Sequence, residues 1–310
     1  MPGAGLRVVL AFALASAVPL TAFGQSSAPA AAPQAAAPAG AQAPGKPAAK
    51  PKARSRAPEF KMVVEPRAVD LLKAMSARLG AARTLSFSAT VSYEFPSKLG
   101  PPLVYATRYD VAMQRPDRFR VITPGDGPAS EFYYDGRNMV AYAPAENLAA
   151  VSPAPPTIDA MLKAAYDGAA IYYPFTDLVL ADPFAALSEG MKLAFYIGPS
   201  AVVGGVKTEM LAWANDDVFL QIWVGAEDKL PRRVRAMFRA DPLRLRHDME
   251  LSNWQLDGPI AAEAFTSSKA QSANRMAFAA PKVTLPPGLK PLAVGKPGKS
   301  AAPKPAAKPN

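Results

Sequence analysis

The sequence predicts a mainly β protein of the α+β class, built on one curved antiparallel sheet of about ten strands. Residues 85–95 alternate apolar and polar side chains without interruption, which is typical of a strand with one buried face. Segments of this kind recur along the chain between turn residues, whereas only three segments have the apolar spacing or capping residues of helices. Because one face of so large a sheet needs a cover, we expect an N-terminal helix and central helices to lie on it.

The three helices are predicted from apolar periodicity and end signals. Residues 67–83 place apolar side chains three and four positions apart, on one face of an amphipathic helix. Residues 157–167 do the same, and Gly168 is expected to end that helix. An Asp–Pro pair begins a third, short helix over residues 183–188.

The strands form two runs on either side of the central helices. In the first run, two long strands are joined at Pro101–Pro102, and Asp135–Gly136 between aromatic segments predicts a hairpin. A Pro-rich joint at residues 152–156 leads into the helices, and the second run is expected to be a meander of neighbouring strands. The expected strands are residues 85–95, 103–114, 118–122, 131–134, 138–142, 191–197, 207–214, 218–224, 232–239 and 244–254.

The two ends of the chain differ in composition from its middle. Residues 1–24 combine one early cation, an apolar run and the small-residue pattern Ala22-Phe23-Gly24, which predicts a cleaved signal peptide and export. The apolar run is well short of the roughly 20 residues that cross a bilayer as a helix. Residues 25–58 and 281–310 are rich in Ala, Pro and Lys and are expected to be a disordered linker and tail around a β domain at residues 59–280.

The net charge of +10 comes from these two ends. Residues 59–280 hold 23 of the Lys and Arg residues and all 25 Asp and Glu residues, so the expected domain is nearly neutral. This balance excludes a surface that tracks phosphates, and no nucleic-acid partner is expected. The basic ends are interpreted as solvated spacers, or alternatively as segments attracted to an anionic membrane or cell wall.

Residues that carry chemistry are few. The chain has no Cys, which excludes lipid modification at Cys, disulfides and thiolate chemistry. Its one histidine, His247, should lie on the opposite strand face from Asp248, so the two cannot form a dyad. His247 is interpreted as a buried or rim residue, with a pH-sensitive switch as the alternative. No catalytic residue, metal site or cofactor is expected.

Five local motifs resemble those of an uncharacterised periplasmic family related to the LolA-like lipoprotein carriers. Together with the flanking elements they span residues 65–265. The motifs are Arg115-Pro116-Asp117-Arg118-Phe119-Arg120, Phe132-Tyr133-Tyr134-Asp135-Gly136, Thr157-Ile158-Asp159, Gln221-Ile222-Trp223-Val224 and Leu230-Pro231-Arg232-Arg233. The resemblance implies a half-open barrel under helices. Family members often carry Cys and His where this chain has Thr208 and Met210, which argues against a metal or redox role here.

The resemblance implies a concave apolar face that holds an acyl chain, lipid or lipidated partner. We expect a non-catalytic periplasmic protein that is a monomer. The alternative is an envelope sensor or scaffold that recognises another protein through the same concavity. Candidate lining residues are the apolar positions that share one face of the clearest strands: Phe87, Val91, Tyr93, Tyr109, Val111, Phe119, Val121, Leu245, Met249 and Leu251. The alternative for each of these is ordinary core packing against the helices.

Overall fold

The computed structural model describes residues 63–125 and 127–280. The expected signal peptide (1–24), linker (25–58) and tail (281–310) lie outside the described residues. Within the described part of the chain, no helix combines the length and the apolar character needed to cross a membrane.

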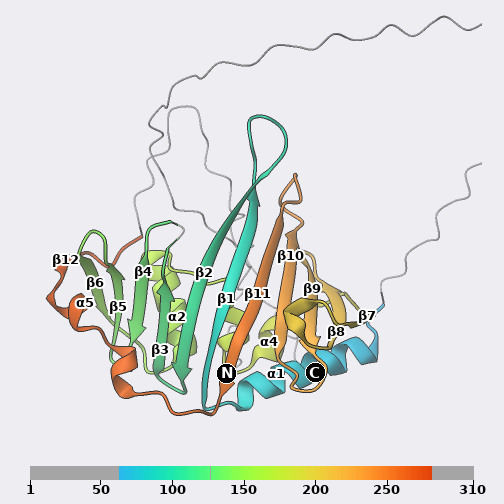
Figure 1. Ribbon diagram of the computed structural model, residues 1–310, viewed down its shortest axis with the longest axis horizontal. Coiled ribbons are helices and arrows are strands. Elements are labelled where there is room, and N and C mark those ends of the chain that lie inside the picture. Colours follow the sequence, from blue (N-terminus) through green and yellow to red (C-terminus); the bar gives the residue numbers. More distant parts are fainter. Residues whose placement is uncertain (1–62, 126, 281–310) are drawn as a thin grey trace, which may run out of the picture.

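Twelve strands form one open sheet in the order β12-β6-β5-β4-β3-β2-β1-β11-β10-β9-β8-β7. All neighbours are antiparallel except β12 and β6. The sheet is curved and does not close (Figure 1). The strands are β1 (Thr84–Phe95), β2 (Leu103–Gln114), β3 (Arg118–Thr123), β4 (Ser130–Tyr134), β5 (Asn138–Ala143), β6 (Leu148–Pro153), β7 (Leu193–Ser200), β8 (Thr208–Ala214), β9 (Val218–Gly225), β10 (Pro231–Phe238), β11 (Arg246–Leu256) and β12 (Asn274–Met276).

The ten predicted strands are confirmed, with ends that differ by at most three residues. Two strands were missed. Residues 152–153, expected in a loop-like joint, belong to β6, whose Ala-rich sequence has low strand propensity. The three residues of β12 are too few to show alternation. Tertiary pairing with β5 and β6, rather than local preference, places both segments in the sheet.

The first and last long strands are neighbours at the centre of the sheet. β1 pairs with β2 along its whole length on one side and with β11 on the other. Strands β2 to β6 extend from this centre in one direction, and the meander from β11 back to β7 extends in the other. The meander that the turn residues predicted is confirmed.

The helices are α1 (Pro66–Ala81), α2 (Ile158–Ala169), α3 (Thr176–Val179), α4 (Pro183–Leu187) and α5 (Ser268–Ser272), with 3-10 turns at Val203–Gly205 and Ala262–Phe265. The predicted cap of α4 is present, because the Asp182 side chain accepts from the Ala185 backbone N–H at 2.9 Å. The α2 helix ends at Ala169, two residues later than expected. The prediction that Gly168 ends it was wrong: Gly168 lies in the last turn, and Ala170 is the cap, in the left-handed conformation (φ 54°).

The core lies between the concave face of the sheet and helices α1 to α4. The α1 helix packs on β7 and β8, and α2 and α4 lie behind the sheet in the view of Figure 1. Leu72, Met75 and Leu79 of α1 are fully buried, as their spacing predicted. Arg115, from the first of the five motifs, donates to the carbonyls of Ala82 (3.2 Å) and Leu180 (2.9 Å) and so connects the end of β2 with the helical layer.

A second, smaller cover lies on the convex face. The α5 helix contacts β5 and β6, and its Ala270 and Ala273 pack with Tyr142 and Ala149 of those strands. The sequence predicted a helical cover on one face only. The second cover was missed because α5 is five residues long and has no apolar periodicity.

Candidate functional site

Nine of the ten predicted lining residues lie on the concave face of their strands, where helices cover most of them, and Leu245 lies in the turn before β11. Three of the ten, Tyr93, Tyr109 and Leu245, remain partly exposed. The other seven are between 0% and 6% exposed and form part of the main core: Phe87, Val91, Val111, Phe119, Val121, Met249 and Leu251. The helices therefore cover most of the concave face of the central strands, and Tyr93 and Tyr109 are the partly exposed members of the set on that face.

An open cavity of about 430 Å³ lies on the concave side of β2 to β6. Its floor is the sheet, and its walls are the end of α2 with residues 169–173 and the C-terminal segment 276–279. The cavity includes Tyr109 from the predicted set. Most of its lining side chains are apolar or aromatic, among them Tyr109, Phe132, Ala141, Leu148, Ala150, Ile171, Tyr172, Tyr173, Met276 and Phe278. Thr123, Ser130 and Glu131 are its polar lining residues.

Aromatic rings make the rigid inner wall of this cavity. Tyr173 stacks on Phe175 at 5.3 Å between ring centroids and meets Tyr109 (5.9 Å) and Phe132 (6.1 Å) edge to face. Burial raises the pKa of Tyr173 and also that of Tyr172, so both phenols stay neutral over the physiological range. The wall therefore presents uncharged aromatic surface to whatever enters.

The end of α2 turns the chain onto the sheet and so builds this wall. The Ala170 N–H bonds to the carbonyls of Ala165 and Tyr166, and the Ile171 N–H bonds to Ala165 at 3.2 Å. These contacts cap the helix and direct Ile171, Tyr172 and Tyr173 across the concave face. These three residues were not predicted to line the site. The available signal was a pair of aromatic residues in a segment of loop composition directly after a helix end.

The opposite wall is a strap, defined here as residues 277–280. It runs from β12 at the edge of the sheet to the end of α2, where the Ala280 N–H donates to the Gly168 carbonyl at 3.1 Å. The Phe278 ring lies against Gly168, since a Cβ at that glycine would be 3.8 Å from Phe278 Cε1. The strap is thus held to the end of α2 by one backbone hydrogen bond, from Ala280, and by one ring, that of Phe278.

A buried carboxyl group lies close to the aromatic wall. Asp177 of α3 is 7% exposed, and burial, followed by the nearby charge of Glu189, raises its pKa to about 7. The charge of Asp177 in turn contributes to the raised pKa of Tyr172, after burial itself. Asp177 is therefore the titratable group next to the cavity whose charge changes near neutral pH.

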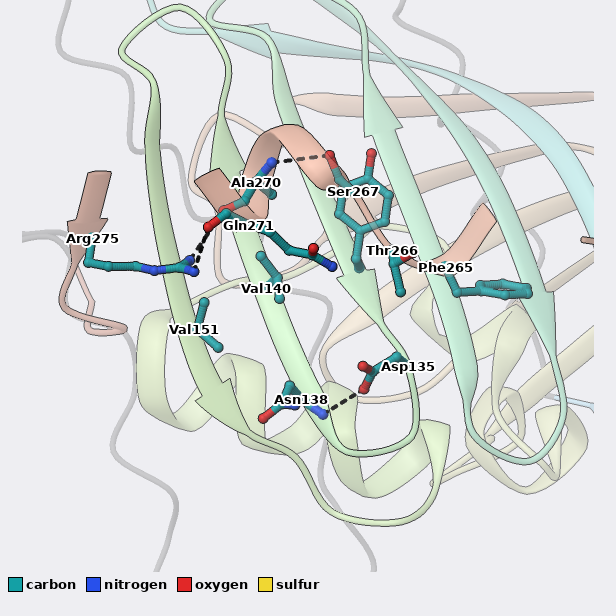
Figure 2. Close-up of a pocket in the computed structure, with 11 residues that line it drawn as sticks. Asp135, Asn138, Val140, Val151, Phe265, Thr266, Ser267, Ala270, Gln271 and Arg275 are labelled. Atoms are coloured by element: carbon teal, nitrogen blue, oxygen red, sulfur yellow. Dashed lines mark hydrogen bonds between the residues drawn. The ribbon is translucent and has the colours of Figure 1, made fainter. Parts of the chain in front are cut away.

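A second pocket, of about 150 Å³, lies on the convex face under α5 (Figure 2). Its polar side chains bond to nearby backbone: Ser267 caps α5 through the Ala270 N–H, Asp135 accepts from the Asn138 N–H, and Arg275 donates to the Ala270 carbonyl. These bonds hold the local structure, and the volume is below the range of about 300–1,000 Å³ typical of ligand pockets. The cavity on the concave face is the better candidate.

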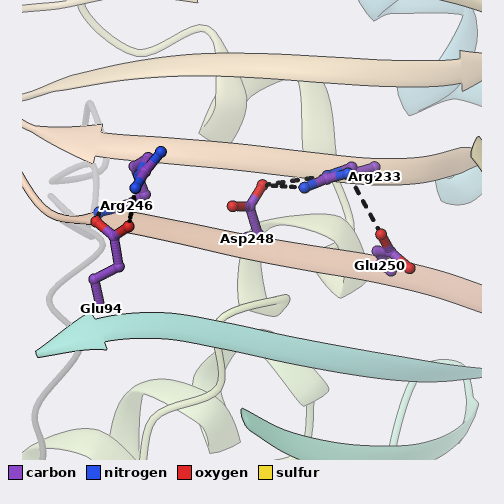
Figure 3. A network of polar contacts seen from close by, with 5 residues as sticks. All are labelled: Glu94, Arg233, Arg246, Asp248 and Glu250. Atoms are coloured by element: carbon purple, nitrogen blue, oxygen red, sulfur yellow. Dashed lines mark hydrogen bonds and ion pairs between the residues drawn. The ribbon is translucent and has the colours of Figure 1, made fainter. Parts of the chain in front are cut away.

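The groups around His247 do not form a catalytic arrangement. Asp248 lies on the convex face, where it pairs with Arg233 at 2.9 Å, and Arg233 also meets Glu250 (Figure 3). His247 meets the Phe238 ring edge to face at 5.2 Å, and burial lowers its pKa. The prediction that His247 and Asp248 face opposite sides is confirmed. Within residues 63–125 and 127–280, no group of three or more acidic or histidine side chains could hold a metal ion.

A family model with the description "Predicted periplasmic protein (DUF2092)" matches residues 68–279. The chain belongs to the DUF2092 family. The matched region runs from the first turn of α1 to the strap, so the cavity lies inside the DUF2092 region. The predicted membership of an uncharacterised periplasmic family is confirmed. A search of curated proteins found no match.

The chain is also similar to several solved structures. In the MucA/MucB complex of Pseudomonas aeruginosa, the similar chain is 16% identical, with a TM-score of 0.36 over 66% of this chain and 62% of that chain. A lipoprotein-sorting protein domain from Vibrio parahaemolyticus is 9% identical (TM-score 0.33, 66% and 98% covered). A LolA superfamily protein from Nitrosomonas europaea is 11% identical (TM-score 0.30, 64% and 97% covered). These similarities are weak and assign no ligand or partner to this chain.

Proposed function

We propose that this protein is a non-catalytic periplasmic binding protein that holds an acyl chain or another apolar group in the concave-face cavity. The observation that carries the proposal is the cavity itself. It is open, has a volume of about 430 Å³, and lies within the size range typical of small-molecule sites, which are mostly apolar.

The energetics favour a hydrocarbon occupant. Each methylene group that leaves water for an apolar site contributes about 0.8 kcal/mol. The aromatic wall around Tyr173 is already ordered by its contacts with Phe175 and Tyr109, so binding does not have to immobilise it. A preformed surface that is mostly apolar and aromatic suits an acyl chain, although Glu131 also lines the cavity.

The family description and the proposed leader support the proposed compartment. The matching family model is described as periplasmic, and residues 1–24 have the features of a cleaved signal peptide. A binding protein in this compartment would keep an apolar group away from water between membranes. A lipidated partner would present the same chemistry to the cavity.

Lipid extraction from the purified full-length protein, followed by mass spectrometry, tests the proposal. Bound acyl species are expected, as is saturable uptake of a fluorescent fatty acid at micromolar protein. Ala141→Phe, which fills the cavity from β5, should weaken uptake about tenfold or more. Val151→Phe is the matched control, because Val151 is 41% exposed and lies outside this cavity.

Two results would contradict the proposal. One is a lipid-free extract together with no uptake of the probe. The other is uptake that Ala141→Phe and Val151→Phe leave equally unchanged. If the protein instead retains an envelope protein and Ala141→Phe abolishes that contact, the cavity belongs to a sensor or scaffold and not to an acyl carrier.

A further inference from the structure

The hairpin of β1 and β2 projects beyond the rest of the sheet (Figure 1). The pairing of β11 with β1 ends at Tyr93, and the pairing of β3 with β2 ends at Asp110. Residues 93–105, defined here as the hairpin tip, therefore extend past the neighbouring strands. The tip carries no helical cover from the elements that pack on the core.

The hairpin tip exposes large apolar side chains on both of its faces. Leu99 at its end is 92% exposed and Val104 is 67% exposed. Phe95, Leu103 and Tyr105 are between 41% and 52% exposed. Exposed apolar side chains that gather on a projecting element mark a surface that contacts a protein or a membrane.

The turn between β10 and β11 brings a further apolar residue to the same end of the molecule. Leu243 in this turn is 60% exposed. The Arg246 backbone N–H and side chain bond to the Glu94 carboxylate, which holds the start of β11 beside the hairpin tip (Figure 3). Asp241 accepts from the Leu243 and Leu245 backbone N–H groups and orders the turn.

A cation adjoins each of the two most exposed leucines at this end, and the acid of the β10–β11 turn, Asp241, is bonded to the turn backbone. Lys98 precedes Leu99, and Arg244 follows Leu243. Among the ion pairs between described residues, none involves either cation. The one acid within the hairpin tip, Glu94, is already paired with Arg246.

Aromatic rings lie on the two strands of the hairpin tip, level with the Glu94–Arg246 ion pair. Tyr93 and Tyr105 stack at 5.8 Å, and Phe95 meets Tyr105 edge to face at 6.2 Å. Proteins that contact an anionic bilayer place aliphatic side chains deepest, Tyr rings at the headgroup level and cations beside the anionic lipids. The hairpin tip has the same three kinds of side chain.

We infer that the hairpin tip, together with the β10–β11 turn, is a membrane-docking element that inserts its aliphatic side chains among the headgroups of an anionic bilayer. The tip is already ordered, because the Leu99 N–H bonds to the Ser97 side chain and three prolines flank the turn. Insertion therefore costs little conformational entropy. The inference does not depend on a ligand in the cavity.

The absence of Cys from the chain allows a site-specific test on the full-length protein. Leu99→Cys, labelled with an environment-sensitive dye, is mixed with vesicles containing phosphatidylglycerol and with vesicles of phosphatidylcholine alone. Val202→Cys is the matched control, because Val202 is 86% exposed and lies in the loop between β7 and β8, at the other end of the sheet. A blue shift and dequenching are expected at position 99 only, and more strongly with the anionic vesicles.

A second variant measures the contribution of the apolar side chain. Burial of one leucine side chain corresponds to about a tenfold or larger change in a partition constant, so Leu99→Asp should weaken vesicle binding by at least that factor. Val202→Asp should leave vesicle binding unchanged.

The inference is overturned if the dye at position 99 does not respond, if positions 99 and 202 respond alike, or if Leu99→Asp binds vesicles as well as the unaltered chain. A response at position 99 to an envelope protein, with none to vesicles, would also overturn it in favour of a protein-docking surface.

Discussion

Phe87 of β1 stacks on Trp254 of β11, with 4.5 Å between the ring centroids and 27° between the ring planes. The Trp254 Nε1–H donates to the Pro231 carbonyl at 2.9 Å. Phe87 also meets Phe175 edge to face, with 5.4 Å between the ring centroids. One aromatic pair thus connects the first long strand, the last long strand and the helical layer. The two strand runs of the sheet are held together at this point.

Phe87→Ala is expected to lower the free energy of unfolding by about 3–5 kcal/mol, because it leaves a cavity where three elements meet. Phe87 is 3% exposed, so little relaxation by solvent entry is available. Urea denaturation followed by tryptophan fluorescence measures the change. Val202→Ala, at an exposed position, should stay within about 0.5 kcal/mol of the unaltered protein. A loss below 1 kcal/mol at Phe87 would contradict its central role.

Local alternation was enough to predict β1 and its partner, since every second residue of β1 from Leu85 to Val91 is buried on the concave face. It could not predict that β11 would lie beside β1, because that pairing joins segments more than 150 residues apart. The missed strand β6 has an Ala-rich sequence whose place in the sheet depends on its neighbours.

The candidate site was predicted only in part for a similar reason. Alternation indicated which side chains face the concavity, and Val121 and Tyr109 both do so. It could not indicate which of them the helices would cover, because that depends on how α1 to α3 pack. Val121 is 1% exposed, whereas Tyr109 lines the open cavity. The cavity walls come from Tyr172, Tyr173 and the strap, which have no periodic signal.

Asp177 makes stability depend on pH near neutrality. Its pKa in the folded protein is about 7, above the ordinary value of 3.8, so the folded state binds more protons than the unfolded state between these values. The stabilising contribution of the protonated form is complete below about pH 4 and is lost as the pH rises through 7. Asp177→Asn removes this dependence and is expected to be more stable than the unaltered protein at pH 8, by a few kcal/mol.

Urea denaturation at pH 5 and pH 8 measures this effect. The advantage of Asp177→Asn should be much smaller at pH 5, where the native carboxyl is already mostly protonated. Asp167→Asn is the control, because Asp167 is an exposed partner of Lys163 on α2. It should change stability by no more than about 0.5 kcal/mol at either pH. Equal effects of the two substitutions at pH 8 would rule out the buried carboxyl as the cause.

His247 should titrate below the ordinary value for histidine. Burial disfavours its charged form and lowers its pKa, so the ring is neutral in the folded protein at neutral pH, and its stabilising contribution is lost as the pH falls through the lowered pKa. It is the only histidine of the chain, so its ring protons can be assigned without mutagenesis. A proton NMR titration should give a midpoint below 6.5 in the folded protein and near 6.5 in urea. A folded midpoint above 6.5 would support the alternative of a charged pH switch.

The strap is expected to control access to the cavity, because its described end is held by the Ala280–Gly168 hydrogen bond and the Phe278 ring. Phe278→Ala removes the ring but keeps the backbone bond possible, so the strap should open more often. Hydrogen exchange of the Ala280 amide should become about tenfold faster or more, which corresponds to a loss of about 1.4 kcal/mol in the local opening free energy. Exchange in β1 should not change, because global stability is set by the central core.

If Phe278→Ala accelerates exchange in β1 and in the strap equally, the ring stabilises the whole domain and the strap is not a separate opening unit. If the Ala280 amide of Phe278→Ala exchanges at the unaltered rate, Phe278 does not hold the strap. The strap then stays in place without the Phe278 ring.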